Sequence, residues 1–438
     1  MNLPEEYLNE MKQLLKDDFR NYTESLSMPS FNGLRVNTSK ISVNDFLKIS
    51  PFHLEPVPWC KEGFYYREED RPSTHPYYYA GLYYLQEPSA MSPGAFLPVE
   101  PDDVVLDGCA APGGKTTQLA CCLSEGLLVS NDISASRQQA TLKNVERHGF
   151  QNVWVTSSDI SAFPPDTFDK ILLDASCSGE GMFRKDPSLI PSWINRNHEY
   201  YRPIQKELID KAFRLLKDGG MIMYSTCTFN PKENEEVIQY ALTEHPELSL
   251  INLNKHPLFA DGINGLAECA RLYPFSLNGE GHFMALLQKQ GQSKKEEDII
   301  YPSFENEAVE QFLRLLNHDY SKESIFSIGE KVYYSNRRIN TSGIMTLRSG
   351  LLLGTLKRNR FEPSQHLAMS LKAEQFSQTV NLSANDKRTE RYLRGETIQF
   401  ETPYRGWALV CVDGYPLGFA KAEGNKLKNK IEEGHRKL

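Results

Sequence analysis

The sequence lacks the patterns that mark several common classes of protein. Its 438 residues include eight cysteines, but no C-x-x-C pair and no Cys/His cluster, which argues against a structural zinc site and a disulfide framework. No run approaches the roughly 18 apolar residues of a membrane span. The acidic N-terminal segment has no apolar core of the kind found in signal peptides. We therefore expect a cytoplasmic protein that holds no metal, has no membrane partner and acts as a monomer.

Basic residues are fewer than acidic residues overall but are concentrated near the C-terminal end. The net charge is −8, yet from Lys331 onward 19 Lys and Arg face 10 Asp and Glu, a net +9 on a body of net −17. A solvated basic face and a phosphate-binding surface both fit this distribution.

A glycine-rich turn is the most informative stretch that is present. The run VVLDGCAAPGGKTT, from Val104 to Thr117, joins a short apolar strand to a helix predicted at Thr116–Leu123. Such turns expose backbone N–H groups to nucleotides, although an ordinary strand-to-helix turn without a ligand has the same composition. A P-loop is excluded, because Gly108 and Gly114 are separated by five residues where that motif has four, and Pro112 removes an N–H donor.

From Asp103 to about Lys289, strand and helix patterns alternate, which predicts an α/β fold with a doubly wound parallel sheet. The predicted strands are Val104–Leu106, Leu127–Ser130, Val153–Ser157, Lys170–Leu173, Met221–Tyr224 and Phe283–Gln288. The other predicted helices are Ser136–Arg147, Arg202–Leu216 and Pro231–Glu244.

Acidic residues follow three successive strands of this sheet. Asp132, Asp159 and Asp174 stand at strand ends, where ligands of doubly wound sheets bind. Each could instead be a helix cap or a turn residue. Together with the glycine-rich turn they favour a nucleoside ligand, with Asp132 on the ribose hydroxyls and Asp159 on an exocyclic amine. Arg137 could also face the crevice, but a helix-surface charge is the favoured interpretation.

Two cysteines also stand at adjacent strand ends. Cys177 follows the strand that closes at Asp174, and Cys227 follows the next one. A single cysteine is usually a buried packing residue. A pair of cysteines facing one crevice favours a catalytic role, because a thiolate is a soft nucleophile suited to adding to an electron-poor ring carbon.

The motifs between about Arg35 and Lys289 resemble those of the Sun-type RNA cytosine-5 methyltransferases. The motifs that carry the resemblance are DGCAAPGGKTTQ, NDIS, SSDI, LLDASCSGEGMFRK and YSTCTFNPKENE, with RVNT and YLQEPSAM upstream. One departure is Ser176, which stands before the first cysteine where the family usually has proline. The resemblance implies a Rossmann-like S-adenosylmethionine-dependent methyltransferase fold.

The resemblance also implies the roles of the site residues. C5 of cytosine is a poor nucleophile, so Cys227 would add to C6 and activate the ring, and Cys177 would assist its release. Asp174 would bind the N3/N4 edge of the base, and Lys115 would lie beside the crevice and lower the pKa of a thiol. The residues implied to hold S-adenosylmethionine are Cys109, Ala110, Ala111, Pro112, Gly113, Gly114, Lys115, Asp132, Asp159 and Asp174.

The C-terminal region resembles the extension of bacterial 16S ribosomal-RNA methyltransferases, which ends in a PUA-like RNA-binding domain. Trp407–Gly414, Pro416–Lys421 and the Lys426/Lys428/Lys430 run carry this similarity. The implied substrate is 16S rRNA or the 30S subunit. A transfer-RNA cytosine-5 methyltransferase and a non-catalytic RNA-binding or ribosome-assembly module are the alternatives.

We predict an N-terminal RNA-binding α/β domain, a catalytic domain, a linker, a first mixed C-terminal domain and a PUA-like β-rich domain. Their predicted bounds are 1–73, 74–290, 291–300, 301–375 and 376–438.

Overall fold

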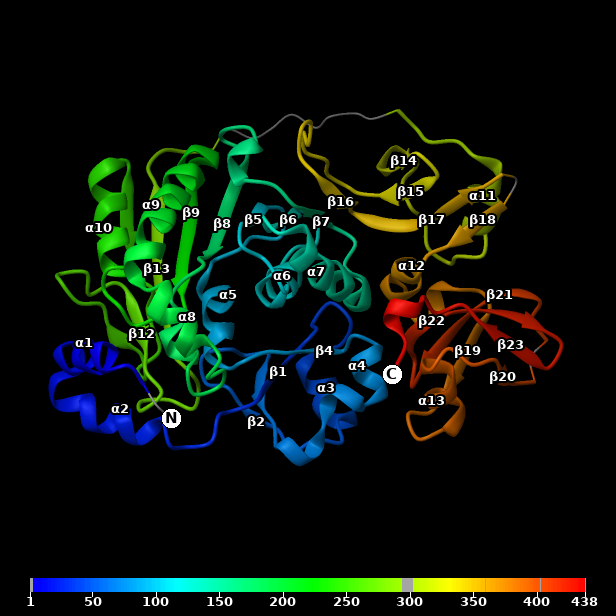
Figure 1. Ribbon diagram of the computed structural model, residues 1–438. Helices are drawn as coiled ribbons and strands as arrows, with labels where there is room; N and C mark the ends of the chain where they lie inside the picture. Colours follow the sequence, from blue (N-terminus) through cyan, green and yellow to red (C-terminus); the bar gives the residue numbers. More distant parts are fainter. Residues whose placement is uncertain (1–2, 294–301, 359, 402, 438) are drawn as a thin grey trace.

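The computed structural model describes residues 3–293, 302–358, 360–401 and 403–437. Figure 1 shows a large central sheet flanked by three smaller ones, which belong to an N-terminal unit and two C-terminal units. The predicted linker at 291–300 lies almost wholly outside the described residues. No helix within the described ranges combines the length and apolar composition that a bilayer crossing needs.

The N-terminal unit is built on an antiparallel sheet of order β2-β3-β1-β4. Its sheet continues past residue 73, because β4 pairs with β1. The strands are β1 (Gly33–Val36), β2 (Glu55–Pro56), β3 (Gly63–Tyr65) and β4 (Tyr83–Leu85), and the helices up to the central sheet are α1 (Glu5–Leu15), α2 (Phe19–Ser25), α3 (Val43–Ile49), α4 (Pro76–Tyr79) and α5 (Ser92–Phe96).

The central sheet has a parallel core of order β7-β6-β5-β8-β9, with antiparallel strands at both sides. The core strands are β5 (Val104–Asp107), β6 (Leu127–Asn131), β7 (Val153–Thr156), β8 (Phe168–Asp174) and β9 (Leu216–Thr226). Beyond β9 lie β10 (Leu248–Ile251), β11 (Ala260–Asp261), β12 (Ala270–Leu272) and β13 (His282–Lys289). The predicted strands are all present. The prediction that they all run parallel is wrong for the last one, because β13 runs antiparallel to β9.

Helices cover both faces of this sheet because successive strand residues point to opposite faces. Leu106 packs in the same apolar cluster as Ile209 of one helix layer, and its neighbour Val105 packs in a second cluster with Leu119 of the other layer. The helices of the two layers are α6 (Gly114–Ala120), α7 (Ala135–His148), α9 (His198–Leu215) and α10 (Glu235–Glu244), whereas α8 (Leu189–Asn195) packs with α1 and α2.

The first C-terminal unit gives one strand to the central sheet. Strand β16 (Thr346–Ser349) pairs antiparallel with β7. The contact continues beyond the strand, because the Ser157 N–H donates to the Met345 carbonyl at 2.8 Å and the Met345 N–H donates to Ser158 Oγ at 3.1 Å. The rest of the unit comprises α11 (Glu307–Leu313), β14 (Ile325–Ile328), β15 (Lys331–Tyr334), β17 (Leu351–Lys357), β18 (Arg360–Pro363) and α12 (Gln365–Ser370).

The last unit packs against the N-terminal one, as Figure 1 shows near the C-terminus. One apolar cluster includes Leu34 and Tyr83 from the first unit with Val410 and Leu417 from the last. The elements of this last unit are β19 (Thr379–Leu382), α13 (Lys387–Leu393), β20 (Ile398–Gln399), β21 (Gly406–Val412), β22 (Tyr415–Glu423) and β23 (Lys426–Asn429).

A buried carboxylate ties both C-terminal units to α7. Glu146 accepts hydrogen bonds from Arg348 of β16 and, at 2.9 Å, from His435 Nε2 near the C-terminus. Burial opposes ionisation, but the His435 hydrogen bond and the Arg348 charge outweigh it and lower the pKa of Glu146 to about 2.

We expect Glu146→Gln to reduce the free energy of unfolding at pH 7 by about 3 kcal/mol, because it leaves Arg348 without its buried carboxylate. The folded pKa is depressed, so this stabilisation is complete above the ordinary value of 4.5 and is lost as pH falls towards 2. Urea unfolding at pH 7 and pH 3 measures the difference. Glu390→Gln is the control, since Glu390 is about half exposed and its loss should cost about 1 kcal/mol or less.

Candidate active site

The turn between β5 and α6 is compact and closely packed. The Ala110 N–H donates to the Asn131 carbonyl of β6 at 2.9 Å, and the Gly113 N–H donates to the Ala110 carbonyl at 2.7 Å. Gly113 has φ of +99°, and a Cβ there would lie 3.0 Å from Thr141. Glycine is therefore required at this position. The helix begins at Gly114, two residues before its predicted start.

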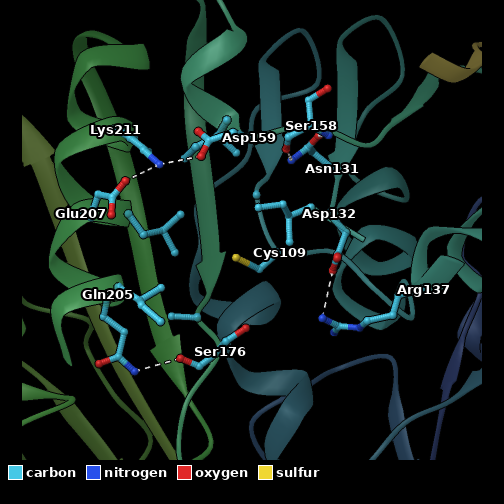
Figure 2. A pocket seen from close by; sticks show the side chains of 16 residues that line it. Cys109, Asn131, Asp132, Arg137, Ser158, Asp159, Ser176, Gln205, Glu207 and Lys211 are labelled. Atoms are coloured by element: carbon cyan, nitrogen blue, oxygen red, sulfur yellow. Dashed lines mark hydrogen bonds and ion pairs between the residues drawn. The ribbon is translucent and has the colours of Figure 1, made fainter. Parts of the chain in front are cut away.

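A pocket open to solvent lies at the carboxyl ends of the parallel strands; its empty space, counted together with the adjoining solvent, is about 690 Å³. The structure brings the predicted residues Cys109, Asp132 and Asp159 together in its wall, whereas Ala110–Lys115 are outside the lining. Figure 2 shows Cys109 and Asp159 directed towards the wall formed by α9, whereas Asp132 is directed towards Arg137. The residues that sequence reasoning missed are Asn131, Ser158, Gln205, Glu207 and Lys211.

Arg137 also lines the pocket, and its side chain is at the same time 55% exposed, so both roles considered for it are present. Its Nη1 lies 3.5 Å from Asp132 Oδ2, and its Nη2 donates to the Ala111 carbonyl at 3.1 Å. Asp132 also accepts hydrogen bonds from the backbone N–H of Ser134 at 2.9 Å and from that of Ala111 at 3.3 Å. The turn-residue role considered for Asp132 is therefore real, and it fixes the carboxylate at the pocket wall.

Asp159 meets a lysine from the opposite wall. Lys211 Nζ lies 2.6 Å from Asp159 Oδ2 and 2.7 Å from Glu207 Oε1, as the dashed lines in Figure 2 show. Burial opposes ionisation of Asp159, but the hydrogen bonds from Lys211 and Ser161 and the Lys211 charge together outweigh it and lower the pKa. The sequence offered no signal for this contact, because Glu207 and Lys211 have the spacing of an ordinary surface pair on a helix.

The two cysteines lie in contact beyond the ends of β8 and β9. Cys177 Sγ is 3.4 Å from Cys227 Sγ. The contact with Cys227, together with burial, raises the pKa of Cys177 well above its ordinary value. Ser176, which replaces the usual proline, does not leave the loop unsupported, since its carbonyl accepts a hydrogen bond from Gln205 Nε2 at 3.0 Å.

Asp174 is held by charge and by hydrogen bonds at the end of β8. Lys115 Nζ lies 2.6 Å from Oδ2, and Ser225 Oγ donates to Oδ1 at 2.9 Å. Burial opposes ionisation, but Lys115, His282 and Ser225 together outweigh it and the pKa of Asp174 is lowered. Lys115 thus forms its ion pair with Asp174. That Lys115 also lowers the pKa of a thiol stays a prediction.

A histidine that sequence reasoning did not single out lies behind this pair. His282 Nε2 is 3.7 Å from Asp174 Oδ1. Burial, and then the nearby Lys115 charge, lower the pKa of His282 to about 4, so the ring is neutral at pH 7. The site therefore combines paired thiols with an ionised carboxylate, beside a pocket that has carboxylates on its walls.

Models of protein families match most of the chain in four successive segments. Residues 95–288 match "16S rRNA methyltransferase RsmB/F", and residues 3–88 match the N-terminal domain of 16S rRNA methyltransferase RsmF. Residues 311–371 match the RsmF rRNA methyltransferase first C-terminal domain, and residues 379–437 match the methyltransferase RsmF PUA domain.

Curated relatives resemble the chain over nearly its whole length. Ribosomal RNA small subunit methyltransferase F of Shewanella amazonensis is 32% identical over 98% of this chain and 97% of its own. The protein of the same name from Photobacterium profundum is 32% identical over 98% and 96%.

Solved structures resemble the chain over about two thirds of its length. A methyltransferase homolog from Pyrococcus horikoshii is 32% identical, with a TM-score of 0.57 over 64% of this chain and 93% of its own. NSun6 from the same organism, solved with SFG, has a TM-score of 0.56 over 66% and 99%, and at 22% identity it supports the fold alone.

Proposed function

Because the chain belongs to the 16S rRNA methyltransferase RsmB/F family, we propose that it uses S-adenosylmethionine to form 5-methylcytidine in 16S ribosomal RNA. The observation that carries this proposal is the contact of Cys177 and Cys227, 3.4 Å apart, beside Asp174. The chain acts as a cytoplasmic monomer on 16S rRNA or on the 30S subunit.

The pocket residues fit S-adenosylmethionine by their chemistry. Asp132 and Asp159 offer carboxylate oxygens to a ribose and to an adenine amine, and Ile133 and Ile160 offer apolar surface between them. Of the turn from Cys109 to Lys115, Cys109 itself lines this pocket. When bound, S-adenosylmethionine supplies the electrophilic methyl group.

The residues beyond the pocket prepare the cytosine. The Cys227 thiolate adds to C6, which makes C5 nucleophilic. Asp174 accepts a hydrogen bond from the N4–H of the base, and also from N3 once that nitrogen is protonated, which offsets the negative charge that the thiolate brings into the ring; Lys115 and Ser225 hold the carboxylate in place. After methylation C5 loses its proton to a base, and the electron pair of that C–H bond expels Cys227 from C6. Cys177 assists this release.

The C-terminal units suit an RNA substrate. The region from Lys331 onward has a net charge of +9, which favours contact with the phosphates of RNA. The target cytosine is unstacked before reaction, because C5 and C6 cannot both be reached inside a helix.

Transfer of labelled methyl from S-adenosylmethionine to 16S rRNA, 30S subunits and bulk transfer RNA tests the proposal. We expect label in 16S rRNA or 30S subunits, as 5-methylcytidine by mass spectrometry of the digested RNA. Label in transfer RNA alone would establish the alternative substrate. No transfer to any RNA, with RNA binding intact, would establish a non-catalytic module.

A further inference from the structure

The exposed face of α9 leads from the pocket to an aromatic ring outside it. Ile204, Glu207 and Lys211 lie on this face and line the pocket. Tyr200 lies four residues before Ile204, so it belongs to the same face one helical turn further along. Both side chains are open to solvent, Tyr200 at 47% and Ile204 at 44%.

The ring of Tyr200 is supported by two neighbours. Tyr201 lies edge-on to it at a centroid distance of 5.0 Å, and the Arg196 guanidinium lies 5.2 Å from its centroid. These contacts restrict the ring and place a positive charge beside it. A rigid, half-exposed ring with an adjacent cation is a surface on which a nucleobase stacks at low entropic cost.

The same stretch of α9 contacts the loop of the paired thiols. Gln205 Nε2 donates to the Ser176 carbonyl at 3.0 Å, next to Cys177. Tyr200 therefore stands at the rim of the crevice into which the target cytosine must enter.

An isolated exposed tyrosine needs no explanation. Here three features coincide. Tyr200 lies on the face of α9 that lines the pocket, the Arg196 guanidinium lies against its ring, and Gln205 of the same helix contacts the loop of the paired thiols. RNA that presents an unstacked base is bound by such aromatic and guanidinium planes. The pocket itself takes the cofactor, so the occupant of the rim is the RNA.

We propose that Tyr200 and Arg196 form a stacking site for an unpaired RNA nucleotide adjacent to the target cytosine. The inference rests on the proposed function, because it takes RNA as the substrate of this crevice. Stacking of the flanking base holds the strand in its unstacked form and thereby presents the cytosine to Cys227.

Steady-state kinetics with Tyr200→Ala and Tyr200→Phe tests the site. We expect Tyr200→Ala to lower kcat/KM for RNA about 10-fold, and Tyr200→Phe to stay within about 2-fold of wild type because it keeps the ring. Affinity for S-adenosylmethionine and the midpoint of thermal unfolding should not change. Tyr240→Ala is the matched control, since Tyr240 also has a cation over its ring, Lys206 Nζ at 4.6 Å, but lies on α10 outside the pocket lining.

Ultraviolet crosslinking gives a readout that does not require catalysis. We expect RNA crosslinked to the peptide that contains Tyr200, mapped by mass spectrometry, and no crosslink there in Tyr200→Ala. An unchanged kcat/KM in Tyr200→Ala, or an equal loss of cofactor affinity, would overturn the stacking site. If the wild type transfers no methyl group but crosslinks at Tyr200, the proposed reaction fails while the RNA surface stands.

Discussion

Cys227→Ala is expected to lower kcat for methyl transfer by about 10⁴-fold or more, the order of loss that follows removal of a covalent nucleophile. Without the thiolate no bond forms to C6, and C5 stays too weak a nucleophile. Transfer of labelled methyl to 16S rRNA or 30S subunits measures the rate. Cys122→Ala is the control, because Cys122 is an exposed free cysteine outside the crevice and its loss should leave the rate unchanged.

Cys177→Ala separates the roles of the two thiols. If Cys177 assists release, its loss traps the Cys227–C6 adduct, which denaturing gels detect as a protein–RNA species. An adduct that forms in Cys227→Ala instead would reverse the assignment of nucleophile and release group.

Asp174→Asn is expected to lower kcat/KM by about 10² to 10³-fold, because the amide no longer offers a negatively charged acceptor to the base. It also leaves the ammonium of Lys115, whose side chain is only 9% exposed, without its carboxylate. We expect this to cost about 2 kcal/mol of unfolding free energy, less than for a fully buried pair because Asp174 is about one third exposed.

The double variant Lys115→Met/Asp174→Asn separates the effect of Asp174 on stability from its effect on catalysis. Removing both charges is expected to restore most of the unfolding free energy but none of the activity. Recovery of methyl transfer in the double variant would show that Asp174 only neutralises Lys115 and does not bind cytosine.

The parallel core of the fold and the family were predictable because local patterns determine them. The strands around Val105 and Leu128 are short apolar runs bounded by glycine or acidic residues, and those limits remain visible in the sequence. The family was predicted correctly from motifs of fixed spacing. Cys109, Asp132 and Asp159 could be expected at one edge because parallel strands end together.

Features set by distant contacts were not predictable. The segment that forms β16 is polar and short, and nothing in it indicates that it pairs with β7, some 190 residues earlier. Lys211 and Arg137 look like helix-surface charges until the fold turns them towards a pocket. The antiparallel direction of β13 depends on its long connection from β9, whose course no local pattern encodes.

The strand contributed by the first C-terminal unit determines how the chain can be divided. A catalytic fragment that ended at residue 293 would leave β7, with the sequence VWVT, as the bare edge of the central sheet. Unpaired N–H and C=O groups along such an apolar edge recruit further strands and promote aggregation. A minimal catalytic fragment must therefore retain residues 346–349, and transplanting both C-terminal units between relatives exchanges part of the central sheet as well.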